Sequence, residues 1–93
     1  MARSIIQADK ECYFCKNTLN LEKHHIFGGY ANRKLSEKYG LTVWLCHNCH
    51  NEKPWGVHHN IARMNYLHKL AQEEFNKHYP ELDFMKIFGR NYL

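Results

Sequence analysis

Two closely spaced pairs of cysteines constrain this chain of 93 residues more than any other feature of its sequence. Cys12 and Cys15 form the first Cys-x-x-Cys pair, and Cys46 and Cys49 form the second, with residues 16–45 between the pairs. The two-residue spacing lets each pair bind one metal ion from a tight turn, and four thiolates suit tetrahedral zinc. Because a chain this short buries only a modest core, we expect the four cysteines to hold one structural zinc ion that staples the fold.

Two disulfides or four buried free thiols are the alternatives to zinc. The start of the chain, MARSIIQADK, is too polar and too short for a secretory signal, and no stretch has the apolar length of a membrane helix. We therefore expect a cytosolic protein without a membrane partner, in a compartment where thiols stay reduced. That compartment disfavours disulfides, and four separate thiols would not need paired spacing. A site closed by four thiolates has no open coordination position, so we expect it to be structural and not catalytic.

The hydrophobic pattern predicts one α+β domain over residues 1–93, because no repeat, low-complexity segment or linker divides the chain. An extended strand is expected over 19–26, before a break at Gly28 and Gly29. The apolar, β-rich run at 41–45 predicts a second strand that leads into the second cysteine pair.

Three helices are expected around these strands. A short helix over 33–39 would begin at Asn32 as its cap. A longer helix would run from about Val57, and a final one over 81–88 would begin at Pro80. The first ten residues carry little pattern and are expected to be mobile. The apolar residues at helical spacing in the long helix are Ile61, Met64, Leu67, Leu70 or Ala71, and Phe75.

The chain has 8 histidines, and function is expected in His24, His25, His50 and the pair His58 and His59. Successive residues of a strand point to opposite sides, so His24 and His25 would have different jobs, one toward a metal and one toward a water. His50 directly follows the second cysteine pair, so the zinc site would fix its backbone. His58 would open the long helix and fold back beside His50. Exposed or hydrogen-bonded histidines without a catalytic role are expected at His47, His68 and His78.

Three short strings carry the pattern as a whole: Cys12-x-x-Cys15, Lys23-His24-His25-Ile26 and Leu45-Cys46-x-x-Cys49-His50. Together they resemble the HNH nuclease family, also called ββα-metal or His-Me finger nucleases, over about residues 12–60. The resemblance implies an α+β fold in which a ββα-metal (HNH) core with zinc knuckles precedes a C-terminal helical part at about 58–93. It also implies a metal-dependent DNA endonuclease or nickase that hydrolyses phosphodiester bonds by a one-metal mechanism with a histidine general base.

The resemblance assigns roles to three positions. His25 matches the general base that activates water, and His24 and His50 match two ligands of a catalytic metal. A neutral imidazole can take a proton from water near pH 7, because its unperturbed pKa is about 6.5. The catalytic metal would be one divalent ion, Mg²⁺, Mn²⁺, Ni²⁺, Co²⁺ or Zn²⁺. Nitrogen ligands favour the last four over calcium, and the phosphate supplies the oxygens that Mg²⁺ prefers.

Two positions depart from the family's pattern. The last metal ligand would fall at Pro54, which cannot bind metal, so His58 is the expected replacement and His59 the second choice. The family's middle asparagine would fall at Leu41. The candidates for its orienting role are Asn32, Asn51 and Asn60.

Basic residues between the two strands predict contact with DNA. The formal net charge is +4, and Arg33, Lys34 and Lys38 cluster beside the expected site, where they would bind phosphates without reading sequence. Tyr30, in the glycine loop, is the best candidate for stacking on a base. No element resembles a sequence-reading module, so we expect weak or structure-dependent specificity from this domain alone, or targeting by a partner or a dimer.

A non-catalytic zinc-ribbon module that binds nucleic acid is the alternative function, and it would hold one metal ion only. The short chain and its end, residues 84–93, are also similar to small phage proteins of the recombination-associated HNH type. That similarity implies a recombination or packaging protein of the phage or its host as a partner. It also implies a location in the cytoplasm of a bacterium or of a phage-infected host cell. The oligomeric state and the choice between single- and double-strand cutting stay open.

Overall fold

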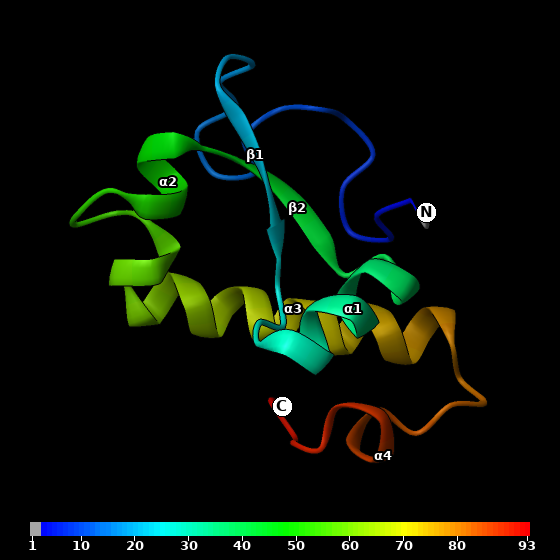
Figure 1. The fold of residues 1–93 in the computed structure, drawn as a ribbon. Coiled ribbons are helices and arrows are strands. Elements are labelled where there is room, and N and C mark those ends of the chain that lie inside the picture. The colour runs from blue at the N-terminus through cyan, green and yellow to red at the C-terminus, as the bar shows by residue number, and fades with distance from the viewer. Residues whose placement is uncertain (1–2) are drawn as a thin grey trace.

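The computed structural model describes residues 3–93, and in this part of the chain the expected α+β class is confirmed (Figure 1). In chain order the elements are β1 (Leu21–His25), α1 (Tyr30–Tyr39), β2 (Thr42–Cys46), α2 (His47–Asn51), the 3-10 turn η1 (Val57–His59), α3 (Ile61–His78) and α4 (Phe84–Phe88). The two strands pair as an antiparallel sheet. α3 crosses beneath this sheet, and α4 lies on the far side of α3 (Figure 1).

The pairing of β1 with β2 sets which side chains share a face. The register places the start of β1 opposite Cys46, so the strand begins beside the second cysteine pair. Because side chains alternate along a strand, Glu22 and His24 point to one side of β1, and Lys23 and His25 point to the other. His24 is buried and His25 is partly buried. The two neighbouring histidines therefore face different surroundings.

α1 begins earlier than the sequence predicted. The expected cap at Asn32 is wrong, because Tyr30 is already helical and Gly29 precedes the helix with a φ of 88°. That φ lies in the region that favours glycine, since a side chain there meets its own backbone. The glycine pair thus turns the chain sharply between β1 and α1.

The start of the described chain is held along the outer edge of β2. The Ser4 hydroxyl donates to the carbonyl of Thr42 at 2.6 Å, and the backbone N–H of Trp44 donates to Oε1 of Gln7 at 2.8 Å. Gly40, at the end of α1, packs so closely on the backbone of residues 3–5 that a Cβ there would collide with it. The expectation of a mobile start is wrong for residues 4–7, because they satisfy the edge of the sheet.

The core lies between the sheet and α3. Leu67, Ala71 and Phe75 recur every four residues and are fully buried, which is the face that the helical spacing predicts. The ring of Phe75 lies 5.3 Å from that of Phe84 in α4, centroid to centroid. Ile61, expected to begin this stripe, is instead 74% exposed. It precedes Leu67 by six residues, which places it about 120° away around the helix.

Polar caps decide where the last two helices begin. The Asn60 side chain accepts the backbone N–H three residues on, at 3.1 Å, so α3 starts after it and Val57–His59 form a separate turn. The expected start near Val57 is therefore wrong. Asp83 caps α4 in the same way at 3.3 Å, so this helix begins at Phe84 and not at Pro80.

Candidate metal centres

The four cysteines come together at the end of β2 and the start of α2. Their sulfur atoms all lie within 4.8 Å of one another, and those of Cys15 and Cys46 are 3.5 Å apart. The sulfur atoms of a tetrahedral zinc site lie about 3.8 Å apart, whereas a disulfide needs about 2.05 Å. All four thiols are free, and three of them are buried. The predicted cluster is confirmed as a group positioned to hold a metal ion, which is consistent with structural zinc.

Backbone groups around the cysteine cluster favour the thiolate form of Cys12. Burial alone would raise the pKa of Cys12. Hydrogen bonds from the backbone N–H groups of Cys15, Cys46 and Phe14 together outweigh burial and lower this pKa to about 6. Burial and the neighbouring sulfur atoms raise the pKa of Cys49 to about 12. A cation would displace the remaining thiol protons, since a coordinating thiol is deprotonated.

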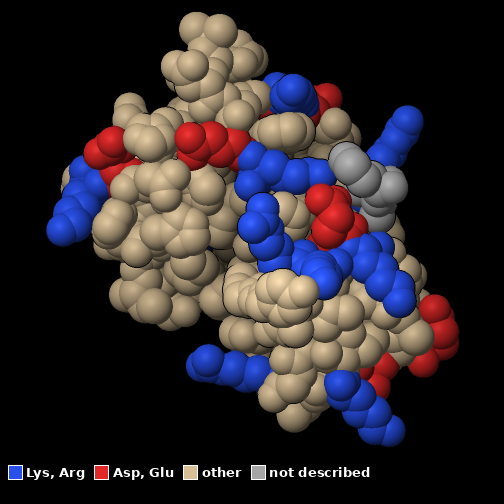
Figure 2. Space-filling view, viewed as in Figure 1, with Lys and Arg blue, Asp and Glu red and all other residues tan. Residues whose placement is uncertain are grey.

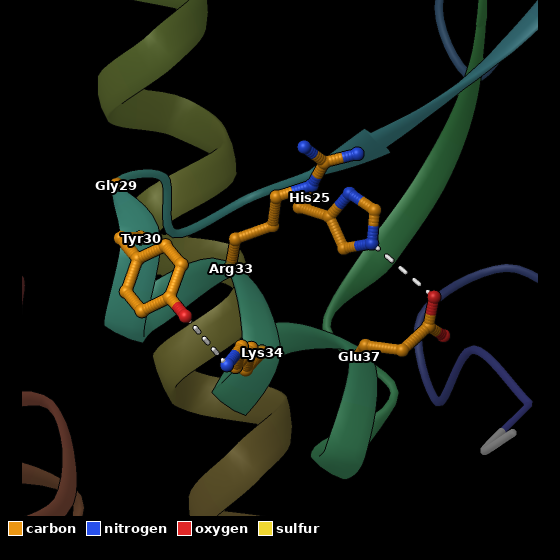
Figure 3. A pocket seen from close by; sticks show the side chains of 6 residues that line it. All are labelled: His25, Gly29, Tyr30, Arg33, Lys34 and Glu37. Atoms are coloured by element: carbon orange, nitrogen blue, oxygen red, sulfur yellow. Dashed lines mark hydrogen bonds and ion pairs between the residues drawn. The ribbon is translucent and has the colours of Figure 1, made fainter.

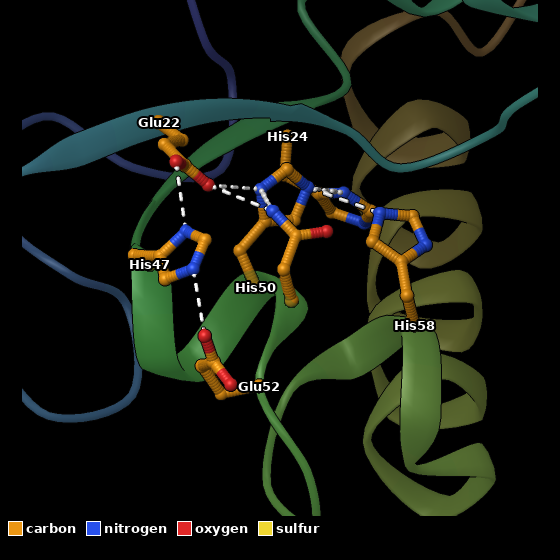
Figure 4. A network of polar contacts seen from close by, with 7 residues as sticks. Glu22, His24, His47, His50, Glu52 and His58 are labelled. Atoms are coloured by element: carbon orange, nitrogen blue, oxygen red, sulfur yellow. Dashed lines mark hydrogen bonds and ion pairs between the residues drawn. The ribbon is translucent and has the colours of Figure 1, made fainter.

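Three histidines from three elements form a second cluster (Figure 4). Nε2 of His50, in α2, lies 3.3 Å from Nδ1 of His24, in β1, and 3.0 Å from Nε2 of His58, in η1. Nitrogens bound to one metal ion at 2.0–2.1 Å lie about 3.0–3.4 Å apart. The structure therefore brings together the three residues expected as metal ligands. His59 lies outside this cluster and lines a separate hollow with Ile61.

Glu22 holds His50 in place. Its Oε1 lies 2.7 Å from Nδ1 of His50, and its Oε2 lies 3.2 Å from Nδ1 of His47 (Figure 4). A carboxylate only accepts, so Nδ1 of His50 carries the proton and the lone pair of Nε2 points at the other two histidines. Carboxylates commonly orient metal-binding histidines in this way. No sequence motif marks Glu22, although its place two residues before His24 puts both on one face of β1.

The surroundings favour the uncharged form of two rings in the histidine cluster. Burial, together with the neighbouring His50 and His58, lowers the pKa of His24 to about 3. Burial also lowers the pKa of His58. Nε2 of His24 is buried and has no hydrogen-bond partner within residues 3–93, which costs about 1–3 kcal/mol. Two uncharged imidazoles that converge with His50 fit a bound divalent cation, because a neutral ring offers a lone pair to a metal.

A cavity of about 290 Å³ opens beside the histidine cluster, lined by Lys23, His24, His25, Gly28, Arg33, His50 and His58. A second hollow of about 600 Å³ shares His25 and Arg33 with the first and continues over α1 (Figure 3). Its other lining residues are Gly29, Tyr30, Lys34 and Glu37. His25 and Arg33 thus stand where the two hollows meet.

His25 contacts an acid that the sequence analysis did not single out. Its Nε2 lies 3.3 Å from Oε1 of Glu37, a residue of α1 (Figure 3). None of the asparagines considered for the orienting role is hydrogen-bonded to His25 within the described chain. Asn60 caps α3, and Asn51 donates to Glu22 at 3.0 Å. No local signal pointed to Glu37, because its contact with β1 joins two separate elements.

The predicted DNA-binding residues divide into two groups. Arg33 and Lys34 line the hollow over α1, whereas Lys38 lines neither hollow. Nζ of Lys38 lies 5.3 Å from the centroid of the Tyr39 ring. Tyr30 is 84% exposed at the start of α1, with Nζ of Lys34 3.1 Å from its hydroxyl. Figure 2 shows Lys and Arg side chains gathered on this face of the molecule around an acidic group.

The other histidines lie as expected. His47 is half exposed and bonds to Glu22 and Glu52, and His78 is exposed. His68 packs against the ring of Phe27, with its Nε2 3.1 Å from the carbonyl oxygen of Ile26.

Comparison of the chain with protein-family models, with curated proteins and with solved structures finds no match. Within residues 3–93, no helix combines the length and the apolar character needed to cross a bilayer. The function is therefore inferred from the residues of the two clusters and of the adjoining hollows.

Proposed function

We propose that this chain is a DNA endonuclease or nickase of the HNH type, with one divalent metal ion at its active site. The observation that carries the proposal is a convergence of groups. Nitrogens of His24, His50 and His58 meet at the wall of a cavity that His25 and Arg33 also line. Phosphodiester hydrolysis needs a proton acceptor, a positive charge for the phosphate and a metal site, and all three lie here together.

The three clustered histidines would hold the metal ion. When bound, a divalent ion supplies positive charge to the phosphate and to the leaving 3′ oxygen. Three nitrogen ligands leave positions for phosphate and water and suit Mn²⁺, Co²⁺, Ni²⁺ or Zn²⁺, while Mg²⁺ would draw on phosphate oxygens. Glu22 orients His50, and zinc on the cysteines would fix the backbone next to His50.

His25 is the proposed general base. Its ring borders the cavity from the other side of β1, so it can take a proton from a water beside the phosphate without competing with His24 for metal. Arg33 lines the same cavity, and its guanidinium can bind two phosphate oxygens at once.

The DNA backbone would cross the hollow over α1. Lys34 would contact a neighbouring phosphate, and Lys38 would add charge from the next turn of α1. Tyr30 offers an exposed ring for a base. These residues bind backbone and bases without reading a sequence, so we propose that a recombination or packaging protein of a phage or its host directs the chain to its DNA.

A plasmid-nicking assay with a panel of Mg²⁺, Mn²⁺, Ni²⁺, Co²⁺ and Zn²⁺ tests the proposal. The wild-type protein should cut, and His25→Ala should still fold and bind DNA while losing about a hundred- to ten-thousandfold in rate. Metal analysis should find two ions per chain when the supporting metal is present. A zinc-ribbon module that only binds nucleic acid would hold one metal ion and would not cut the plasmid with any metal of the panel. Equal cutting by His25→Ala would refute the role of His25.

A further inference from the structure

Glu37 is an acid on a face that the proposed function gives to DNA. It lines the same hollow as Arg33 and Lys34 (Figure 3), and its side chain is 31% exposed. A carboxylate there repels phosphates and weakens DNA binding. Its presence therefore calls for a reason other than binding.

The contacts of Glu37 supply that reason. Oε1 lies 3.3 Å from Nε2 of His25, and Nζ of Lys23 donates to both carboxylate oxygens, at 3.2 and 3.1 Å. Lys23 and His25 are two residues apart on one face of β1, and Glu37 approaches them from α1. The lysine thus holds the carboxylate against the imidazole.

The carboxylate decides which nitrogen of His25 carries the proton. It can only accept, so a neutral ring must donate through Nε2 and keep its lone pair on Nδ1. In Figure 3, that second nitrogen points away from Glu37, on the side of the Arg33 guanidinium. The available lone pair is therefore turned toward the group proposed to bind the phosphate.

We infer that Glu37 is a positioning residue for His25. It holds the ring and keeps the proton on Nε2, so that Nδ1 accepts the proton of the attacking water, and it does so at the expense of DNA affinity. This inference rests on the proposed nuclease function. If Glu37 only tied α1 to β1, its loss would lower stability and would not separate DNA binding from cutting.

Two substitutions of Glu37 test the inference against a matched control. Glu37→Ala removes charge and hydrogen bond, and Glu37→Gln keeps the size of the side chain. Glu81→Gln removes one exposed acid from the turn between α3 and α4. The measurements are kcat for the nicking of supercoiled plasmid, the Kd for a DNA duplex without divalent metal, and the thermal midpoint.

Both Glu37 variants should cut about ten- to a hundredfold more slowly at saturating DNA, because the lone pair of His25 is no longer directed. Both should bind DNA about two- to fivefold more tightly, because a repelling charge is gone and Lys23 is released. Glu81→Gln should change neither quantity by as much as twofold. An unchanged kcat, or a parallel loss of kcat, affinity and thermal midpoint in Glu37→Gln, would overturn the inference.

Nitrogen-15 NMR of the imidazole rings gives a readout that does not need cutting. In the wild-type protein, His25 should show a protonated Nε2 and an unprotonated Nδ1, and Glu37→Ala should mix the two tautomers. A proton on Nδ1 of wild-type His25 overturns the inference even if the chain cuts DNA. If the wild-type chain shows the expected tautomer but cuts DNA with none of the metals tested, the nuclease proposal is refuted. The placement of the His25 ring by Glu37 would still stand.

Discussion

The cysteine cluster and the histidine cluster differ in how they meet their surroundings. Four sulfur atoms close the first cluster on all sides, and three of these cysteines are buried. Three nitrogens form the second, at the wall of a cavity that also reaches His25 and Arg33. A closed ligand set can only hold a metal ion, whereas an incomplete set beside a cavity leaves room for a reactant. Under the proposed function, the first cluster would hold the fold and the second would serve the reaction.

Loss of the cysteine site should have the largest effect. We expect Cys12→Ser to lose the zinc ion and to unfold at 25 °C. Structural zinc contributes about 10–16 kcal/mol in small domains, comparable to the whole stability of about 5–15 kcal/mol of a typical protein. Circular dichroism and metal analysis of the purified protein measure both effects. His24→Ala is the control and should keep one zinc ion and its helices. A folded Cys12→Ser protein would contradict the contrast between the two clusters.

Loss of a histidine ligand should affect only the second site. We expect His58→Ala to weaken metal binding at the histidine cluster by more than about a hundredfold, because one of three ligands is lost. The matched control is His59→Ala, which changes a neighbouring histidine outside the cluster. Calorimetric titration of the zinc-loaded protein separates the two variants. An equal loss of metal affinity in the two variants would show that His59 also serves as a metal ligand.

A smaller effect is expected from the carboxylate behind His50. Glu22→Gln should weaken the same metal site by about ten- to a hundredfold, because the neutral amide no longer fixes the proton on Nδ1 of His50. Glu52→Gln is the control, since Glu52 bonds to His47 and not to a ligand. The zinc content of both variants should stay at one ion. The same calorimetric titration measures the difference.

Competition between protons and metal ions should also separate the two sites. The pKa of Cys49 is raised to about 12, so this thiol must release a proton to bind metal at neutral pH. The pKa values of His24 and His58 are lowered, so these rings are neutral at that pH and already offer a lone pair to a metal ion. As pH falls from 8 to 6, the affinity of the cysteine site should drop by roughly tenfold per pH unit for each proton displaced. Chelator competition at several pH values should show a shallower slope for the histidine site.

The local pattern predicted the layout of the strands better than the starts of the helices. The strand expected at 19–26 contains β1, and the one expected at 41–45 overlaps β2. All three helix starts were misplaced, because Gly29, Asn60 and Asp83 set them through turns and caps. Apolar spacing reports which face of a helix is buried and says little about its first residue.

By itself, the sequence predicted the cysteine cluster, from two Cys-x-x-Cys pairs, and the opposite directions of His24 and His25, from the alternation of side chains along a strand. Only the tertiary structure decided that His58 and not His59 meets His50, and that Glu37 faces His25. Each of these contacts joins two separate elements. Their distances depend on how β1, α1 and η1 pack together, and no local pattern specifies that packing.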